Sequence, residues 1–182
     1  PVMVCFDGFR LSHTMMPVSV PSQGEVDAFL PAFQPPYVLD ADKPVNINPV
    51  VMTDPIADPQ GTLCPGYMGF RRRLQEDLET ALPVIAEAGR SFEAGFGRSY
   101  EDPLYRYRTE DADFLFAAMG SVAGEASETV DMLRDEGVRA GVIGLRVFRP
   151  FPARIVSRAL QRAKCIAVVE KAISYGYEGA LN

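Results

Sequence analysis

The chain has 182 residues, of which 47% are hydrophobic and 23% charged, and it carries a formal net charge of −6 at pH 7. This composition is typical of a soluble protein with an apolar core, and the negative charge argues against a nucleic-acid-binding surface, which would be basic. The three cysteines and the single histidine are too widely spaced for a zinc or iron–sulfur motif, so the sequence predicts no metal site.

Cysteine usage and apolar patterning also bear on the compartment. An odd number of scattered cysteines is typical of a reducing environment, so we expect a cytoplasmic protein without disulfides. No apolar run approaches the roughly 18–20 residues of a transmembrane helix, and no signal-peptide pattern is present. The sequence begins at Pro1, enters an apolar run at once, and ends at Asn182 without a finished element. We therefore expect a piece of a longer protein.

The N-terminal segment predicts one strand and one short helix. Residues 2–6 form an unbroken apolar run followed by an Asp-Gly turn, which predicts a buried strand within residues 1–9. This strand would complete a sheet formed by other parts of the protein. Residues 10–21 are predicted to be irregular, and a Ser-x-x-Glu capping box at Ser22 predicts a helix that ends at Pro31.

Residues 34–67 contain seven prolines. Because proline lacks a backbone donor and restricts the residue before it, the segment is predicted to be a long extended arm. It also carries apolar residues such as Tyr37 and Val51, so we expect it to pack on a neighbouring domain or subunit. Cys64 lies in this arm without a histidine nearby in the sequence, and it is not interpreted as a catalytic thiol.

A long amphipathic helix is predicted over residues 68–96. Its apolar stripe consists of Leu74, Leu78, Leu82 and Ile85. Pro83 predicts a kink or a break near residues 79–83. The three arginines at 71–73 are interpreted as a solvated face, with an intersubunit or anion contact as the alternative.

The C-terminal part of the sequence predicts an α/β fold. Apolar strands are expected over residues 113–119, 140–147 and 165–169, and helices over residues 122–136 and 153–163. Wholly apolar strands that alternate with helices are typical of a parallel sheet with flanking helices. The crossovers between such strands are expected to be right-handed.

Two further features lie at strand ends. The Gly120–Gly124 turn is interpreted as a structural strand-to-helix turn with Ser121 as N-cap, since it lacks the spacing of a nucleotide-binding loop; anion binding is the alternative. Arg146 and Arg149 follow the next strand. They are interpreted as local salt bridges or turn-stabilising contacts, with a carboxylate or subunit contact as the alternative.

The densest polar cluster follows the first predicted strand. It consists of Asp7, Arg10, Ser12 and His13. Ligands of open parallel sheets bind beyond the carboxyl ends of strands, so this cluster is a candidate ligand-proximal site. A lone histidine can act as an acid or base, but without further partners a structural role is the more frequent case.

Four motifs occur in order along the chain: D-G-F-R-x-S-H from Asp7, G-R-S-Y from Gly97, A-M-G-S from Ala118 and R-V-F-R-P-F-P from Arg146. Together they resemble the alpha subunit of pyruvate:ferredoxin oxidoreductase and related 2-oxoacid:ferredoxin oxidoreductases, in its C-terminal portion. The resemblance covers nearly the whole chain and is weakest in the proline-rich arm.

The resemblance implies a division into three parts. Residues 1–21 would end a domain that holds the pyrimidine side of thiamine diphosphate. Residues 22–110 would form a linker arm with amphipathic helices, and residues 111–182 would begin a domain resembling the transketolase C-terminal domain, left incomplete.

It also implies an activity for the assembly. Such an enzyme decarboxylates a 2-oxoacid on thiamine diphosphate, passes electrons through iron–sulfur clusters to ferredoxin, and releases acyl-CoA. Pyruvate is the default substrate, with branched-chain 2-oxoacids and oxalate as alternatives. The resemblance places thiamine diphosphate and magnesium mostly outside this chain and the clusters on other domains or subunits.

This chain would then supply structure and subunit contacts, and it is expected to be inactive alone. Any residues near substrate or cofactor would be Asp7, Arg10, Ser12 and His13, in a positioning role. Three other interpretations stay open: a non-catalytic interaction module that uses the arm and the arginine-rich helix, a thiamine-dependent transketolase- or dehydrogenase-type domain without ferredoxin, and an independent nucleotide-binding domain.

Overall fold

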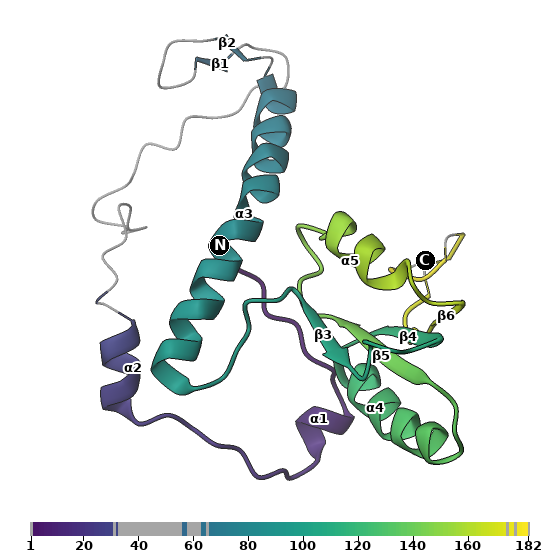
Figure 1. Ribbon diagram of the computed structural model, residues 1–182. Coiled ribbons are helices and arrows are strands. Elements are labelled where there is room, and N and C mark those ends of the chain that lie inside the picture. The colour runs from purple at the N-terminus through teal and green to yellow at the C-terminus, as the bar shows by residue number, and fades with distance from the viewer. Residues whose placement is uncertain are drawn as a thin grey trace. The chain divides into compact units, whose positions relative to one another are not determined.

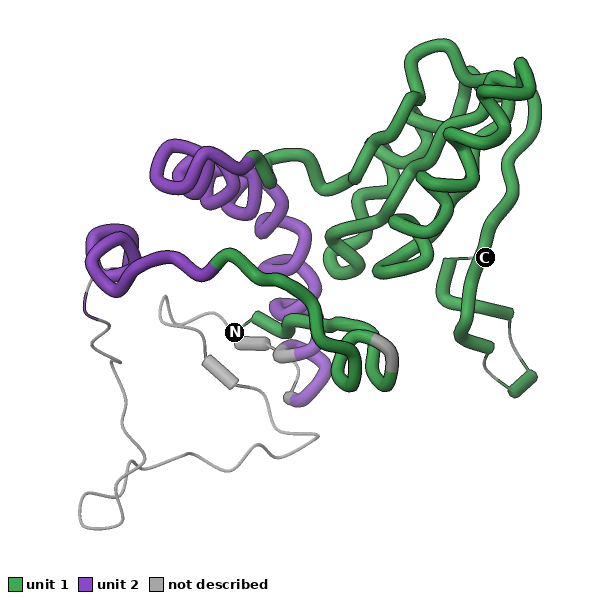
Figure 2. Tube along the Cα trace, turned by 90° about the horizontal axis from the view of Figure 1, so that it is seen from below, with its two compact units in different colours: residues 1–19, 99–182 green, residues 20–98 purple. Residues whose placement is uncertain are grey.

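The computed structural model describes residues 2–30, 32, 56–57, 63–64, 66–173, 175–176 and 178–181. The chain divides into two compact units, which Figure 2 colours separately. One unit comprises residues 1–19 with residues 99–182, and the other comprises residues 20–98. The extended arm predicted over residues 34–67 lies for the most part outside the described residues.

The smaller unit is built on helices. Helix α2 (Gln23–Phe29) begins with the predicted capping box, in which the Ser22 hydroxyl accepts the Glu25 N–H and the Glu25 carboxylate accepts the Ser22 N–H. Phe29 then packs edge-on against two phenylalanines of helix α3 (Gly66–Phe96), with ring centroids 5.3 and 5.6 Å away. Both predicted helices are therefore confirmed.

The sequence predicts a kink or a break near residues 79–83, and helix α3 is continuous across Pro83, so the helix is not broken there. Leu74, which belongs to the predicted apolar stripe of this helix, is 45% exposed. Two short antiparallel strands, β1 (Ile56–Ala57) and β2 (Leu63–Cys64), precede it.

The larger unit contains a four-stranded sheet (Figure 1). Its strands in chain order are β3 (Leu104–Tyr107), β4 (Phe114–Met119), β5 (Ala140–Leu145) and β6 (Cys165–Val168). Their spatial order is β3-β5-β4-β6, with β4 parallel to both β5 and β6. The three predicted strands are confirmed as a parallel set.

Strand β3 was not predicted, and it pairs antiparallel with β5, so the sheet is mixed. Leu104 and Ile143 are almost fully buried on one face, whereas Tyr105 lies on the other face against Gly144. A Cβ atom at Gly144 would stand 3.0 Å from Ala123 and 3.1 Å from Tyr105. Because Gly144 has no side chain, Tyr105 of the neighbouring strand and Ala123 of the helix that follows β4 can both pack closely against its backbone.

Two helices cover opposite faces of the sheet (Figure 1). Helix α4 (Gly120–Asp135) packs one face around the fully buried Val130 and Val142. Helix α5 (Ala153–Leu160) packs the other face, where Leu115 and Ile143 are buried. Both helices confirm the sequence prediction, and the sheet is the middle layer of three.

The N-terminal segment corrects two predictions. The strand expected over residues 1–9 is not formed: residues 2–7 pair with none of the described strands, and Val2 is 92% exposed. A strand is stable only when a neighbour satisfies its backbone groups, and sequence pattern alone does not supply that neighbour. Residues 10–21, predicted to be irregular, begin with the short helix α1 (Arg10–His13).

No helix in the described part of the chain is both long enough and apolar enough to cross a membrane.

Candidate functional site

The carboxyl ends of β4 and β6 open onto a hollow of about 130 Å³. The chain leaves β4 into α4 on one face of the sheet, and it reaches β6 from α5 on the opposite face. Ligands of open α/β sheets bind at such a reversal of strand order. The hollow is lined by Asp7, Met119, Val122, Val169, Glu170, Lys171, Ala172 and Leu181.

The side chain of Asp7 lies at the N-terminus of α4, at this edge of the sheet. Its Oδ2 atom accepts a hydrogen bond of 2.8 Å from the backbone N–H of Ser121. The residue in the N-cap position is Met119, which has no side-chain capping bond, so the prediction of Ser121 as N-cap is wrong. Asp7 instead supplies the capping oxygen from 114 residues earlier in the chain. A carboxylate is favoured there because the helix dipole is positive at its N-terminus.

Lys171 lies beside both Asp7 and Ser121. Its ammonium group donates a hydrogen bond of 3.1 Å to the Ser121 hydroxyl and lies 3.9 Å from Asp7 Oδ1. The Ser121 hydroxyl and then its N–H hold the pKa of the Asp7 carboxyl below its usual range, with a smaller contribution from the charge of Lys171. Asp7 therefore stays ionised at neutral pH, where it can hold the N-terminal segment on the sheet.

Gly120, the first residue of α4, lies against the Asp7 carboxylate. Its φ angle is +57°, a conformation that side chains rarely adopt, and a Cβ atom there would lie 2.9 Å from Asp7 Oδ2. Glycine at this position thus allows both the turn into α4 and the approach of the carboxylate.

A second carboxylate at the same edge binds the C-terminal residues. Glu170 accepts hydrogen bonds from the N–H groups of Ala180 and Leu181, at 2.6 and 3.1 Å. A Cβ atom at Gly179 would overlap the Glu170 carboxylate. Sequence reasoning missed both Glu170 and Lys171. The available signal was their position directly after a predicted strand of a parallel sheet.

Ser12 and His13 make local contacts. The Ser12 hydroxyl lies 2.8 Å from His13 Nδ1, and that ring nitrogen lies 3.0 Å from the Phe9 carbonyl oxygen. Both side chains are exposed. The described contacts therefore join them to each other and to Phe9 rather than to Asp7, and the side chain of Arg10 is outside the described part.

Arg146 and Arg149 contact aromatic rings. The Arg146 guanidinium lies over Tyr100 and Tyr105, 5.2 and 5.7 Å from the ring centres. Arg149 lies over Phe148 at 4.1 Å and donates to its carbonyl oxygen. The described contacts of Arg149 lie within its own turn, whereas those of Arg146 reach two tyrosines that are distant in the sequence.

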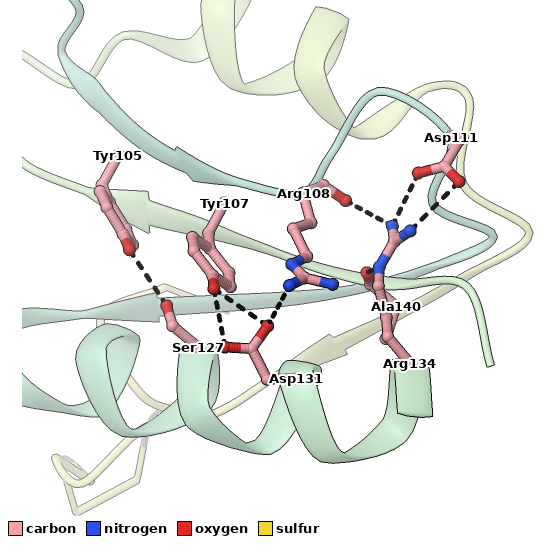
Figure 3. A network of polar contacts seen from close by, with 8 residues as sticks. All are labelled: Tyr105, Tyr107, Arg108, Asp111, Ser127, Asp131, Arg134 and Ala140. Atoms are coloured by element: carbon pink, nitrogen blue, oxygen red, sulfur yellow. Dashed lines mark hydrogen bonds and ion pairs between the residues drawn. The ribbon is translucent and has the colours of Figure 1, made fainter. Parts of the chain in front are cut away.

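A polar network joins β3 to α4 (Figure 3). The Tyr105 hydroxyl lies 3.2 Å from the Ser127 hydroxyl, while the Tyr107 hydroxyl donates to Asp131 at 2.8 Å. Arg108 pairs with the same carboxylate at 2.9 Å. The hydrogen bond to Asp131 is the main cause of the raised pKa of Tyr107. This network fastens the edge strand to the helix.

Arg134 extends the same network, since it donates a hydrogen bond to the backbone carbonyl of Arg108 (Figure 3). It donates to the carbonyl oxygens of Arg108 and Ala140 at 2.8 Å each and to both carboxylate oxygens of Asp111, and its side chain is only 17% exposed. The bonds from Arg134 lower the pKa of Asp111. The described bonds of Arg134 all lie within this unit, where they join α4 to the loop after β3 and to the start of β5.

Metal ligands do not gather in the described part of the chain. No three His, Cys, Asp or Glu side chains there lie close enough together to hold a metal ion. Cys5 and Cys165 are free thiols at exposed positions. The described residues therefore do not fit a magnesium–diphosphate site or a cluster site.

Comparison with known proteins identifies the relatives. Residues 112–182 match the family model described as pyruvate:ferredoxin oxidoreductase core domain II. The chain is 41% identical over 181 residues to pyruvate synthase subunit PorA of Methanothermobacter thermautotrophicus, covering all of this chain and 44% of the relative. It is 37% identical over 182 residues to ketoisovalerate oxidoreductase subunit VorA of Pyrococcus abyssi, covering 43% of that protein.

The chain thus spans less than half the length of the curated relatives it matches. Among solved structures, the alpha chain of a probable 2-oxoacid ferredoxin oxidoreductase from Thermoplasma acidophilum is 28% identical, over 40% of this chain and 62% of that one, with a TM-score of 0.24. That score is too low to support a comparison of the folds. By sequence, residues 112–182 thus match the pyruvate:ferredoxin oxidoreductase core domain II family, and the whole chain is similar to part of a pyruvate synthase subunit and of a ketoisovalerate oxidoreductase subunit.

Proposed function

We propose that the chain is part of a thiamine diphosphate-dependent 2-oxoacid:ferredoxin oxidoreductase. In the overall reaction, a 2-oxoacid and coenzyme A give acyl-CoA and CO2, and the two electrons released reduce ferredoxin. The observation that carries this proposal is the 41% identity to a pyruvate synthase subunit across the full chain. Because that relative is named a pyruvate synthase subunit, pyruvate is the first candidate substrate.

The contribution of this chain is structural. We assign residues 1–21 to the end of the pyrimidine-binding domain, residues 22–110 to the linker and its helices, and residues 111–182 to the transketolase C-terminal-like domain. Thiamine diphosphate supplies the carbanion-stabilising chemistry when bound. Together with magnesium it would be held mostly by residues outside this chain, and the iron–sulfur clusters by other domains or subunits.

Asp7 is proposed as a positioning residue. Its bond to the Ser121 N–H ties the N-terminal segment to the carboxyl edge of the sheet. In the assembly this would hold Arg10, Ser12 and His13 near the cofactor. Arg146 and Arg149 would contribute to a subunit contact beyond the rings that they already cover. The assembly is expected in the cytoplasm, with no nucleic-acid or membrane partner.

A branched 2-oxoacid is the second candidate substrate, because a ketoisovalerate oxidoreductase subunit is also related over the whole chain. The experiment that separates the two measures reduction of methyl viologen by the full-length protein with its co-purified subunits. Coenzyme A is supplied with either pyruvate or ketoisovalerate. We expect a higher kcat/KM for pyruvate. Reduction with neither substrate would contradict the proposed function.

A further inference from the structure

Positive charge is concentrated in one stretch of this acidic chain. Between residues 137 and 169 there are seven arginines and lysines and no aspartate or glutamate, although the whole chain has a net charge of −6. The seven are Arg139, Arg146, Arg149, Arg154, Arg158, Arg162 and Lys164.

Four of these side chains have partners within the fold. Arg139 pairs with Oδ2 of Asp113 at 2.7 Å, and Lys164 pairs with Oδ1 of the same carboxylate at 3.1 Å. Arg146 and Arg149 cover aromatic rings. Their charges are therefore used inside the larger unit.

The other three form what we call the arginine stripe: Arg154, Arg158 and Arg162. The first two lie on α5 and the third in the turn that follows, so each is four residues from the next and all lie on one side of the helix. All three are exposed, and no ion pair or hydrogen bond joins their side chains to any described residue. Arg158 and Arg162 also border a hollow of about 240 Å³ on this surface.

The fold does not require this stripe. Helix α5 is held to the sheet by its opposite side, through residues such as Ile155, Val156 and Leu160. Like charges four residues apart repel each other on a helix, and Arg154 stands in the first turn, where the helix dipole disfavours a positive charge. An external acidic group would offset both effects.

Two exposed aromatic residues precede the arginine stripe in the sequence. Phe148 and Phe151 precede α5 and are 38% and 40% exposed. Exposed aromatic side chains beside arginines are the composition of protein–protein interfaces. The arginine stripe also extends over about 12 Å along the helix axis, which is longer than a single phosphate group can span. A long nucleic acid would meet the negative charge of the rest of the chain.

We propose that the arginine stripe, with Phe148 and Phe151 beside it, is a docking surface for an acidic protein partner. The partner presents carboxylates at intervals along a surface of similar length, together with an apolar side chain for the two phenylalanines. The arginines would steer its approach and fix its register.

The test uses the full 182-residue chain and a fluorescein-labelled peptide of four Glu-Glu-Leu repeats, followed by fluorescence anisotropy. The stripe variant is Arg154→Gln/Arg158→Gln/Arg162→Gln. The matched control is Arg71→Gln/Arg72→Gln/Arg73→Gln, which removes the same charge from α3. We expect the stripe variant to bind at least about tenfold more weakly than the unchanged chain, and the control to bind within about twofold. Circular dichroism confirms that both variants are folded.

Further measurements test which chemistry the binding depends on. A peptide of four Gln-Gln-Leu repeats should not bind, and the affinity for the glutamate peptide should fall as salt is raised from 50 to 300 mM. Phe148→Ala should weaken binding without changing the salt dependence. Equal losses in the two triple variants would overturn the proposal. So would displacement of the peptide by equimolar pyrophosphate, or tighter binding of a single-stranded DNA oligonucleotide than of the peptide.

Discussion

The carboxylate of Asp7 caps helix α4 by accepting the backbone N–H of Ser121 at 2.8 Å, across 114 residues of sequence. Two residues that the sequence flagged separately thus form one contact. The contact ties the N-terminal segment to the carboxyl edge of the parallel strands, beside the hollow between β4 and β6.

Removing the carboxylate should loosen the first turn of α4. In the Asp7→Ala variant the Ser121 N–H loses its acceptor, and we expect its amide to exchange with solvent roughly tenfold faster. Asp7→Asn keeps an acceptor oxygen and should exchange at an intermediate rate. Hydrogen exchange followed by NMR measures this directly. Unchanged exchange at Ser121 in Asp7→Ala would show that the bond does not persist in solution.

The same contact should weaken in acid. The folded-state pKa of Asp7 is held below its ordinary value of 3.8, so its contribution is fully present above that value and is lost as pH falls through the lower, folded pKa. Asp111 and Asp113 are shifted in the same direction by their arginine partners. Urea unfolding at pH values from 6 to 2 should therefore show falling stability below about pH 4. The Asp7→Asn variant should show a shallower fall.

Gly120→Ala should be destabilising for two reasons. The φ angle of +57° strains any side chain, and the added Cβ atom would meet Asp7 Oδ2 at 2.9 Å. We expect a loss of about 1–2 kcal/mol in the free energy of unfolding. In the Asp7→Ala background the clash is absent and only the strain remains, so the same substitution should cost less. An equal loss of unfolding free energy in the two backgrounds would show that the clash with Asp7 does not contribute.

Arg134→Gln tests the network at the other end of α4. The arginine bonds to two backbone carbonyls and to Asp111, and it is largely buried, so its removal should cost about 1–3 kcal/mol in unfolding free energy. Arg139→Gln serves as the control, because its pairing with Asp113 is exposed and its loss should have a much smaller effect. Chemical denaturation compares the two. A larger effect at Arg139 would contradict this assignment.

The sequence was most informative where burial is continuous. The apolar runs of β4, β5 and β6 and the helices between them were predicted because their core residues are close in sequence. Strand β3 was missed because it is only four residues long and includes the charged Arg106, so it lacks a continuous apolar run. Its stability comes from pairing with β5. Pairing of this kind depends on residues far away in the chain.

The same reason limited prediction of the site. Asp7 and Ser121 were both flagged, but nothing local in the sequence indicates that they meet. The apolar run at residues 2–6 was read as a strand, since apolar patterning does not show whether a neighbouring strand is available. Lys171 and Glu170 were overlooked because their roles depend on the turn that follows β6.

The most direct test of the proposed function follows CO2 released from pyruvate labelled at its carboxyl carbon. The full-length protein with its co-purified subunits is compared with the 182-residue chain, both with thiamine diphosphate, magnesium, coenzyme A and methyl viologen. The proposal predicts release by the assembly, with viologen reduced in step, and none by the 182-residue chain. Release by the 182-residue chain alone, or no release by the assembly, would contradict it.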